Sequence, residues 1–288
     1  MTAHPGFHVD VPYSLIQSVR LVHALMETGY GVHVRPEHRD RFSRLEKVFG
    51  ITYVVGVEGA RRLPAVHVDH SAPRTSVGNI QRPLIFPHAI VQRCRTLWAD
   101  DRTVRFSFAG LVTDSRRQVL GDWLRSVDAR AQLDVSKDDA PFSFMRSLGS
   151  WPRRLVDRRR KKSVSVDTGQ VLFWESRRGR HFPGKSWDEE YYELLGRSQF
   201  VLCPSGDYVW TYRFFEAALC GALPIVEKTC DAYSGFRYRA MSDPASDLEW
   251  RREDAEHNYT RCSELLTIPG SSLSNEIAAL LAGGDGRE

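Results

Sequence analysis

The sequence predicts an α/β protein with two Rossmann-like halves, because short apolar segments of strand length alternate with segments of helical periodicity. The clearest example is residues 199–226. Residues 199–203 are apolar and end at Pro204, a pattern typical of a buried parallel strand. Apolar residues then recur at helical spacing as far as Gly221, and a second apolar run, residues 222–226, follows directly. This order of strand, helix and strand predicts a parallel sheet covered by helices.

Residues 1–98 are predicted to form the first half, since strands and helices alternate there without a long linker. The first strand, residues 7–11, ends at Pro12, and Ser14 is placed to cap a helix that ends at Gly29. The remaining predicted elements of this half are a strand at 31–34, a helix at 41–48, and strands at 51–57, 65–68 and 84–86.

Residues 99–270 are predicted to form the second half, and residues 271–288 a closing segment with a helix at 273–281. Ser186 and Glu189 have the spacing of a capping box, and Thr211 is predicted to cap the helix that precedes Gly221. The other predicted elements are a strand at 103–108, a helix at 115–124, a strand at 171–174 and a helix at 187–195.

The composition indicates a globular protein, with 42% hydrophobic and 11% aromatic residues. Forty basic and 36 acidic residues give a formal charge of +4, which by itself indicates no particular partner. The five cysteines lack metal-binding spacing, and their odd number suits a reducing cytosol, so we expect a cytoplasmic protein. No apolar stretch approaches the roughly 20 residues needed to span a bilayer. No pattern in the sequence predicts an oligomeric state.

Polar residues are concentrated where the strand at 199–203 meets its helix, the usual ligand position in α/β sheets. Ser205, Gly206 and Asp207 occupy the loop, Arg213 lies in the first helical turn, and Glu216 follows three residues later. Helix N-termini and arginines suit a diphosphate, and a carboxylate one turn deeper can accept both hydroxyls of a ribose. The alternative is an ordinary Arg213–Glu216 pair on a solvated helix face.

Three motifs of this unit resemble the C-terminal signature of exostosin-like (family 47) glycosyltransferases: LCPSGD at 202–207, YRFFEA at 212–217 and GALPIV at 221–226. Upstream motifs follow in that family's order, namely RPLIFPH at 82–88, RFSFAG at 105–110 with Arg116 and Arg117 after it, and YYELLGRS at 191–198. The segment that begins at Asp207 is also similar to the inverting fucosyltransferases of family 10. Both families share the GT-B architecture, so the resemblance implies two Rossmann-like domains whose parallel sheets face an interdomain cleft.

The resemblance implies an enzyme that moves a sugar from a nucleotide diphosphate to an acceptor hydroxyl with inversion at the anomeric carbon. Residues 1–98 would then be the acceptor side, residues 99–270 would bind the nucleotide sugar, and the closing segment would pack on the first domain. Arg213 is assigned to the diphosphate and Glu216 to the ribose. The other expected donor contacts are Ser205, Gly206, Asp207, Tyr212 and Arg116. The sequence lacks an Asp-x-Asp pair to hold a metal ion, so we expect neither metal nor cofactor.

The acceptor hydroxyl needs a general base, and two carboxylates at predicted strand ends are the leading candidates. Asp10 and Asp69 are the last residues of the related segments His-Val-Asp at 8–10 and 67–69, and His70 and His88 are further candidates. Each of these residues has an alternative structural role, such as capping a helix or pairing with an arginine.

A dense basic run at residues 153–162 is compatible with a solvated face or with a site for nucleic acid or another polyanion. The competing hypothesis is therefore a non-catalytic nucleic-acid-binding or polyanion-binding protein on a degenerate GT-B scaffold. For an enzyme, the acceptor is expected to be a glycan or, as a second possibility, a hydroxylated base in phage DNA. The basic loop at 177–181 is either a segment that closes over an anionic donor or a surface loop.

Overall fold

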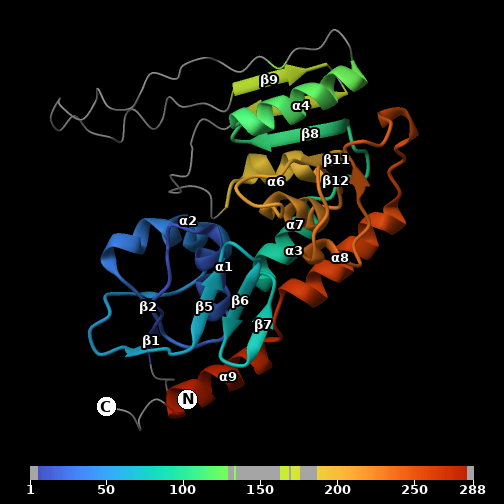
Figure 1. The fold of residues 1–288 in the computed structure, drawn as a ribbon. Coiled ribbons are helices and arrows are strands. Elements are labelled where there is room, and N and C mark those ends of the chain that lie inside the picture. The colour runs from blue at the N-terminus through green and yellow to red at the C-terminus, as the bar shows by residue number, and fades with distance from the viewer. Residues whose placement is uncertain (1–5, 129–132, 134–162, 169, 176–186, 284–288) are drawn as a thin grey trace, which may run out of the picture.

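The computed structural model describes residues 6–128, 133, 163–168, 170–175 and 187–283 (Figure 1). These residues form an α/β fold with two sheets built mainly of parallel strands and a third, antiparallel sheet. The predicted α/β class with parallel sheets is therefore confirmed. In the described parts of the chain, no helix is long and apolar enough to cross a membrane.

The first sheet has the strand order β3-β2-β1-β4, and all its strands are parallel. Helix α1 is buried at all eleven of its positions, although it contains Gln17, Ser18, Arg20 and His23. The bounds are β1 Phe7–His8, α1 Ile16–Met26, β2 Val32–Val34, η1 Pro36–His38, α2 Arg39–Phe49, β3 Val54–Val55 and β4 Arg61–Arg62. The predicted order of elements holds as far as β3, with shorter strands than expected, whereas β4 was not predicted.

A three-stranded antiparallel sheet follows, formed by β5 Val66–Asp69, β6 Arg74–Val77 and β7 Ile80–Arg82. This meander interrupts the alternation of strand and helix that was predicted for this half. The strand predicted at 84–86 is wrong: these residues are buried but lie outside any sheet, and the Phe86 amide donates to the Leu266 carbonyl at 2.8 Å. Helix α3, His88–Thr96, leads into the second half.

The larger sheet has the order β13-β12-β11-β8-β10-β9, in which only the edge strand β9 is antiparallel. Its strands are β8 Val104–Gly110, β9 Ser163–Asp167, β10 Val171–Glu175, β11 Ser198–Cys203, β12 Leu223–Val226 and β13 Arg239–Ala240. The helices of this part are α4 Asp114–Val127, α6 Glu189–Gly196, α7 Tyr212–Leu219, α8 Arg252–Leu266 and α9 Gly270–Gly283, with 3₁₀ turns at Asp231–Tyr233 and Ala245–Asp247.

Apolar residues cover both faces of this sheet, as expected for parallel strands. Phe200 and Leu202 pack with α4 in one cluster, whereas Val201 and Cys203 belong to a second cluster that contains α7. This second cluster continues into the N-terminal half and includes residues from Phe7 to Leu281. Figure 1 shows α4 on one side of the sheet and α6 and α7 on the other.

The strand, helix and strand predicted at residues 199–226 are confirmed as β11-α7-β12, with β11 parallel to β12. Thr211 caps α7 as predicted, because its hydroxyl accepts from the Arg213 amide at 3.2 Å. Gly221 has a φ of +75°, the left-handed conformation that glycine adopts after a helix. Helix α6 is capped by Asp188, whose carboxylate accepts from the Tyr191 amide at 3.3 Å; the predicted cap, Ser186, lies outside the described residues.

Helix α9 contacts the N-terminal half. The Tyr30 hydroxyl donates to the Ser274 carbonyl at 3.4 Å, and the Asn79 amide donates to Glu276 at 2.7 Å. Leu273, Ile277 and Leu281 recur at helical spacing and are buried in the cluster that includes Phe7.

Candidate active site

Arg213 lies at the carboxyl end of β8, although it belongs to α7. Its Nε donates to the Ala109 carbonyl at 3.1 Å, and its guanidinium lies 4.4 Å from the centre of the Phe108 ring. A Cβ at Gly110 would overlap this guanidinium, so the glycine makes room for it. Arg213 is only 7% exposed, and its Nη1 has no hydrogen-bond partner among the described residues. A buried, unpaired guanidinium N–H is costly, which marks this place as suited to an anion.

Arg116 joins the loop after β8 to the loop after β11. Its Nε donates to the Ser205 carbonyl at 3.0 Å and its Nη1 to the Leu111 carbonyl at 3.1 Å. A Cβ at Gly206 would overlap this guanidinium as well. Arg117 points elsewhere and pairs with Asp114 at 3.1 Å on the surface. Two arginines from different helices thus lie at neighbouring strand ends of one parallel sheet.

The loop of Ser205, Gly206 and Asp207 lines a pocket of about 820 Å³. Residues 71–74, from the turn after β5 and the start of β6, also line it, so the two halves of the chain contribute to one pocket. The loop is held in place because the Ser205 amide donates to Glu227 at 3.0 Å and the Gly206 amide to the Tyr208 carbonyl at 3.0 Å. This volume lies within the range of small-molecule sites.

Glu216 is buried and bound within the protein. Its carboxylate accepts from Arg20 of α1 and, at 2.6 Å, from the Tyr191 hydroxyl, while Arg20 also donates to the Tyr192 hydroxyl at 2.8 Å. Burial would raise the pKa of Glu216, but the adjacent Arg20 outweighs it and holds that pKa below its ordinary value. The alternative of a solvated Arg213–Glu216 pair is wrong, because both side chains are buried.

Tyr212 links α7 to α1 and to the turn after β5. Its hydroxyl donates to Gln17 at 3.2 Å and lies 3.0 Å from Nδ1 of His70, whose ring stacks on the Tyr212 ring. Gln17 in turn donates to Thr75 of β6. Sequence reasoning missed Gln17 and Arg20, which read as the polar positions of an ordinary amphipathic helix.

The two expected carboxylate bases have structural partners. Asp10 is exposed and lies 3.6 Å from Arg62. Asp69 accepts from the Ser71 hydroxyl at 2.7 Å and from the amides of Ser71 and Ala72 at 2.9 and 3.3 Å. These hydrogen bonds, above all that from the Ser71 hydroxyl, lower the pKa of Asp69, which makes it a weaker base. Neither Asp10 nor Asp69 lines the pocket of the 205–207 loop.

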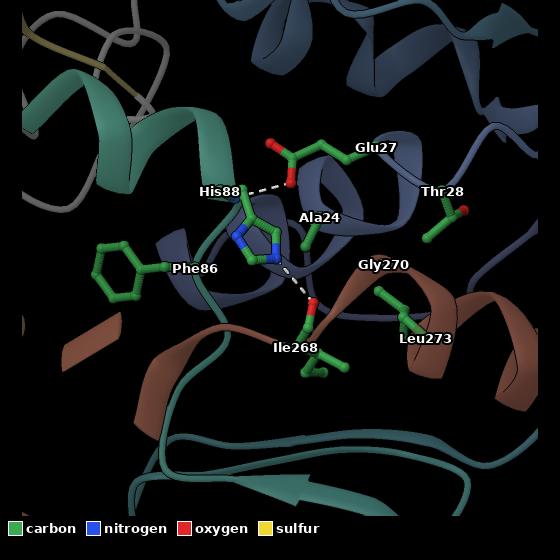
Figure 2. A pocket seen from close by; sticks show the side chains of 8 residues that line it. All are labelled: Ala24, Glu27, Thr28, Phe86, His88, Ile268, Gly270 and Leu273. Atoms are coloured by element: carbon green, nitrogen blue, oxygen red, sulfur yellow. Dashed lines mark hydrogen bonds between the residues drawn. The ribbon is translucent and has the colours of Figure 1, made fainter. Parts of the chain in front are cut away.

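His88 lines a separate, small pocket between α1, α3 and α9, which shares no residue with the larger one (Figure 2). Its Nε2 lies 2.9 Å from the Ile268 carbonyl, and its amide donates to Glu27 at 2.8 Å. Glu27 also accepts from the Ala89 amide at 2.9 Å, so it caps the start of α3. His88 therefore links the start of α3 to the residue after α1 and to the segment between α8 and α9. Within the described ranges, no three His, Cys, Asp or Glu side chains are grouped to hold a metal ion.

One family model of known proteins matches the part of the chain that contains the 205–207 loop. Residues 172–242 match the family model of the RXYLT1 C-terminal domain. The matched segment contains the 205–207 loop, Arg213 and Glu216, whereas Arg116, Asp10 and Asp69 lie outside it. The search of curated proteins found no match, and nothing in the comparisons bears on family 10. The matched domain supports, at the family level, the resemblance of this chain to exostosin-like glycosyltransferases.

Proposed function

We propose that this chain transfers a sugar from a nucleotide diphosphate to an acceptor hydroxyl, with inversion and without a metal ion. The match to the RXYLT1 C-terminal domain, which belongs to an exostosin-family xylosyltransferase, supports the reaction class. The single observation that carries the proposal is the unsatisfied guanidinium of Arg213. Its Nη1 is buried without a hydrogen-bond partner within the described residues, and the side chain lies at the carboxyl end of a parallel strand.

In this proposal Arg213 and Arg116 bind the diphosphate. Negative charge accumulates on the leaving diphosphate in the transition state, and two fixed guanidinium groups stabilise it more than they stabilise the bound donor. Ser205, Gly206 and Asp207 form the donor loop, which lines the pocket and precedes the start of α7. The arginines provide the positive charge that a metal ion supplies in other enzymes.

The ribose contact of Glu216 and the donor contact of Tyr212 stay predictions. Both Glu216 oxygens already accept hydrogen bonds, so a ribose hydroxyl at Oε2 would share that oxygen with Tyr191. The Tyr212 hydroxyl is engaged with Gln17 and His70. A direct role for Glu216 therefore requires that the donor displaces or joins the Tyr191 hydroxyl.

We propose a GT-B arrangement in which residues 1–98 form the acceptor-side domain and residues 99–270 the donor domain, with residues 271–288 closing on the first domain. The pocket lined by both halves and the contacts of α9 with Tyr30 and Asn79 support this division. The proposed acceptor is a glycan. The basic runs at 153–162 and 177–181 lie outside the described residues, and the comparisons give no support for a DNA acceptor.

Binding and hydrolysis of nucleotide sugars test this function. UDP-xylose is the first donor to try because the matched domain comes from a xylosyltransferase, followed by other UDP-, GDP- and dTDP-sugars. Calorimetry would measure donor binding, and nucleoside diphosphate release would measure turnover. If the wild-type protein bound and hydrolysed none of these donors, the proposal would be contradicted.

Substitution of the arginines tests their assignment. Hydrogen bonds to a charged group contribute about 1.5–3 kcal/mol, so Arg213→Met and Arg116→Ala are each expected to weaken donor binding about 10- to 150-fold. Arg213→Met retains most of the side-chain volume, and circular dichroism would confirm that the variant is folded. Arg117→Ala is the matched control, since Arg117 is next to Arg116 in the sequence and forms its ion pair, with Asp114, on the surface. Unchanged donor affinity in a folded Arg213→Met protein would remove the assignment.

A further inference from the structure

An exposed apolar surface lines the pocket beside the 205–207 loop. Tyr208 and Val209 follow that loop directly, line the pocket, and are 38% and 39% exposed. Among the described residues, the other exposed large hydrophobic side chains belong to the first half, namely Val48, Val54 and Val55. Apolar residues that are scattered over a surface need no explanation, whereas an exposed pair inside a pocket indicates a place where a ligand packs.

The segment that carries this surface is held at both ends. The Gly206 amide donates to the Tyr208 carbonyl at 3.0 Å, and the Thr211 amide donates to the Tyr233 hydroxyl at 2.8 Å. Between these two anchors, Trp210 also lines the pocket and is only 6% exposed. The exposed pair is therefore presented by an ordered segment, and a ligand that packs on it has little ordering to impose.

The charged side chains of the pocket lining balance one another. Arg74 and Lys228 are basic, and Asp207 and Asp231 are acidic. The two arginines assigned to the diphosphate are not among the residues that line this pocket. A diphosphate prefers a site with net positive charge, so the pocket suits an uncharged part of the reaction.

An aromatic surface surrounded by charges of both signs matches the chemistry of a sugar. The C–H groups on one face of a sugar ring are apolar and can pack on an aromatic ring. The hydroxyl groups around the edge of the ring donate to carboxylates and accept from arginine or lysine. Tyr208 supplies the aromatic ring, and the four charged residues of the lining supply hydrogen-bond donors and acceptors from both halves of the chain.

The pocket adjoins the proposed diphosphate site. Gly206 lines the pocket, and a Cβ on this glycine would overlap the guanidinium of Arg116, so that arginine contacts the lining. Residues 71–74 and Pro83 of the first half contribute to the same lining. The acceptor hydroxyl must reach the carbon that carries the diphosphate, so an acceptor site has to lie next to the diphosphate site. This pocket meets that requirement.

We propose that the pocket binds an uncharged glycan acceptor and that a sugar of this acceptor stacks on Tyr208, an inference that rests on the proposed function. Arg74 from the first half and Asp231 from the second half bind hydroxyl groups of the acceptor. Tyr208 thereby determines the affinity for the acceptor, whereas the buried arginines determine the affinity for the donor.

Acceptor kinetics test the role of Tyr208. The wild type is given the nucleotide sugar that it hydrolyses in the donor panel together with an array of uncharged and uronic-acid-containing oligosaccharides, and mass spectrometry identifies the product. Stacking on an aromatic ring contributes about tenfold in affinity, so Tyr208→Ala is expected to raise the acceptor KM about tenfold with unchanged donor affinity. Tyr208→Phe keeps the ring and should retain the wild-type KM.

Matched controls separate the pocket from the rest of the surface. Val54→Ala should retain the wild-type KM, because Val54 is 46% exposed on β3 and does not line the pocket. Arg74→Ala tests the contribution of the first half and is expected to raise the acceptor KM about tenfold, since it removes a charged hydrogen-bond donor. Arg44→Ala, at an exposed position of α2 outside the pocket, is its control. Circular dichroism would confirm that each variant is folded.

The outcomes distinguish this inference from the proposed function. An unchanged acceptor KM in folded Tyr208→Ala would overturn the role of Tyr208 while the glycosyltransferase proposal stands. Transfer to uronic-acid-containing glycans alone, or donor hydrolysis without transfer to any glycan, would also contradict the inference. Equal losses of donor and acceptor affinity in Tyr208→Ala would place this residue in the donor site instead. A wild-type protein that binds no nucleotide sugar would overturn the proposed function, and the acceptor role of the pocket with it.

Discussion

Removal of the Arg20 guanidinium should strongly destabilise the protein, because it leaves the carboxylate of Glu216 buried without its cation. The two side chains are 2% and 8% exposed, belong to α1 and α7, and are 196 positions apart in the sequence. Breaking a buried ion pair by removing one partner costs about 3–5 kcal/mol. For a chain of this size, with roughly 2 °C per kcal/mol, Arg20→Met is expected to lower Tm by about 6–10 °C.

A double-mutant cycle measures the coupling itself. Arg20→Met, Glu216→Gln and the double variant would be compared by calorimetry and urea unfolding at pH 7. We expect the double variant to be less destabilised than the sum of the single variants, since it lacks an unpaired buried charge. The matched control is the Arg93–Glu189 pair, which also joins the two halves but is 45% and 30% exposed and should contribute less than about 1 kcal/mol.

The pH dependence of this pair has a definite sign. The folded pKa of Glu216 is depressed below its ordinary value of 4.5, so the stabilisation is present above that value and is lost as pH falls through the folded pKa. The difference in stability between wild type and Arg20→Met should therefore shrink below about pH 4.5. Additive single-variant effects, or a difference that stays constant down to pH 3, would refute the reasoning.

Three other predictions concern single residues. Burial lowers the pKa of His23 from 6.5 to about 3, so stability should fall by about 1.4 kcal/mol per pH unit below 6.5, and urea unfolding of His23→Phe should show a flatter pH profile. An equal slope in the variant would contradict this. Gly110→Ala should displace the Arg213 guanidinium and weaken donor binding at least tenfold by calorimetry; wild-type affinity would show that the arginine can move. Arg102→Lys should cost about 1–3 kcal/mol in thermal unfolding, because one ammonium cannot reach the carbonyls of Leu195, Ser198 and Cys220 together, and an unchanged Tm would contradict this.

The β11-α7-β12 unit could be predicted from the sequence because its signals are local. Within about 25 residues, a short apolar run marks the strand, a threonine cap marks the start of the helix, and a glycine in the left-handed conformation marks its end. The two strands of this unit are also neighbours in the sheet. The same signals placed Ser205, Gly206 and Asp207 in one loop, and the structure brings them to one pocket.

The partners of Glu216 could not be predicted, because they depend on contacts between distant segments. Arg20 follows Val19 in a helix that has polar residues at several positions, so its periodicity suggests one solvated face. The structure instead buries the whole of α1. Likewise, the short spacing between Asp69 and Ser71 is equally compatible with a catalytic carboxylate and with a turn cap, and the turn contacts of Asp69 are visible only in the hydrogen bonds of the structure.

Arg102 shows how a residue away from the pocket can govern it. One guanidinium binds the carbonyl oxygens at the ends of α6 and α7 and at the start of β11, at 2.6 and 3.1 Å for Ser198 and Cys220. Helix α7 carries Arg213 and Tyr212, so its placement sets the geometry of both. A random-mutagenesis screen for lost turnover should therefore recover inactive variants at this position, and crystal structures of such variants would show Arg213 and Tyr212 intact but in displaced orientations.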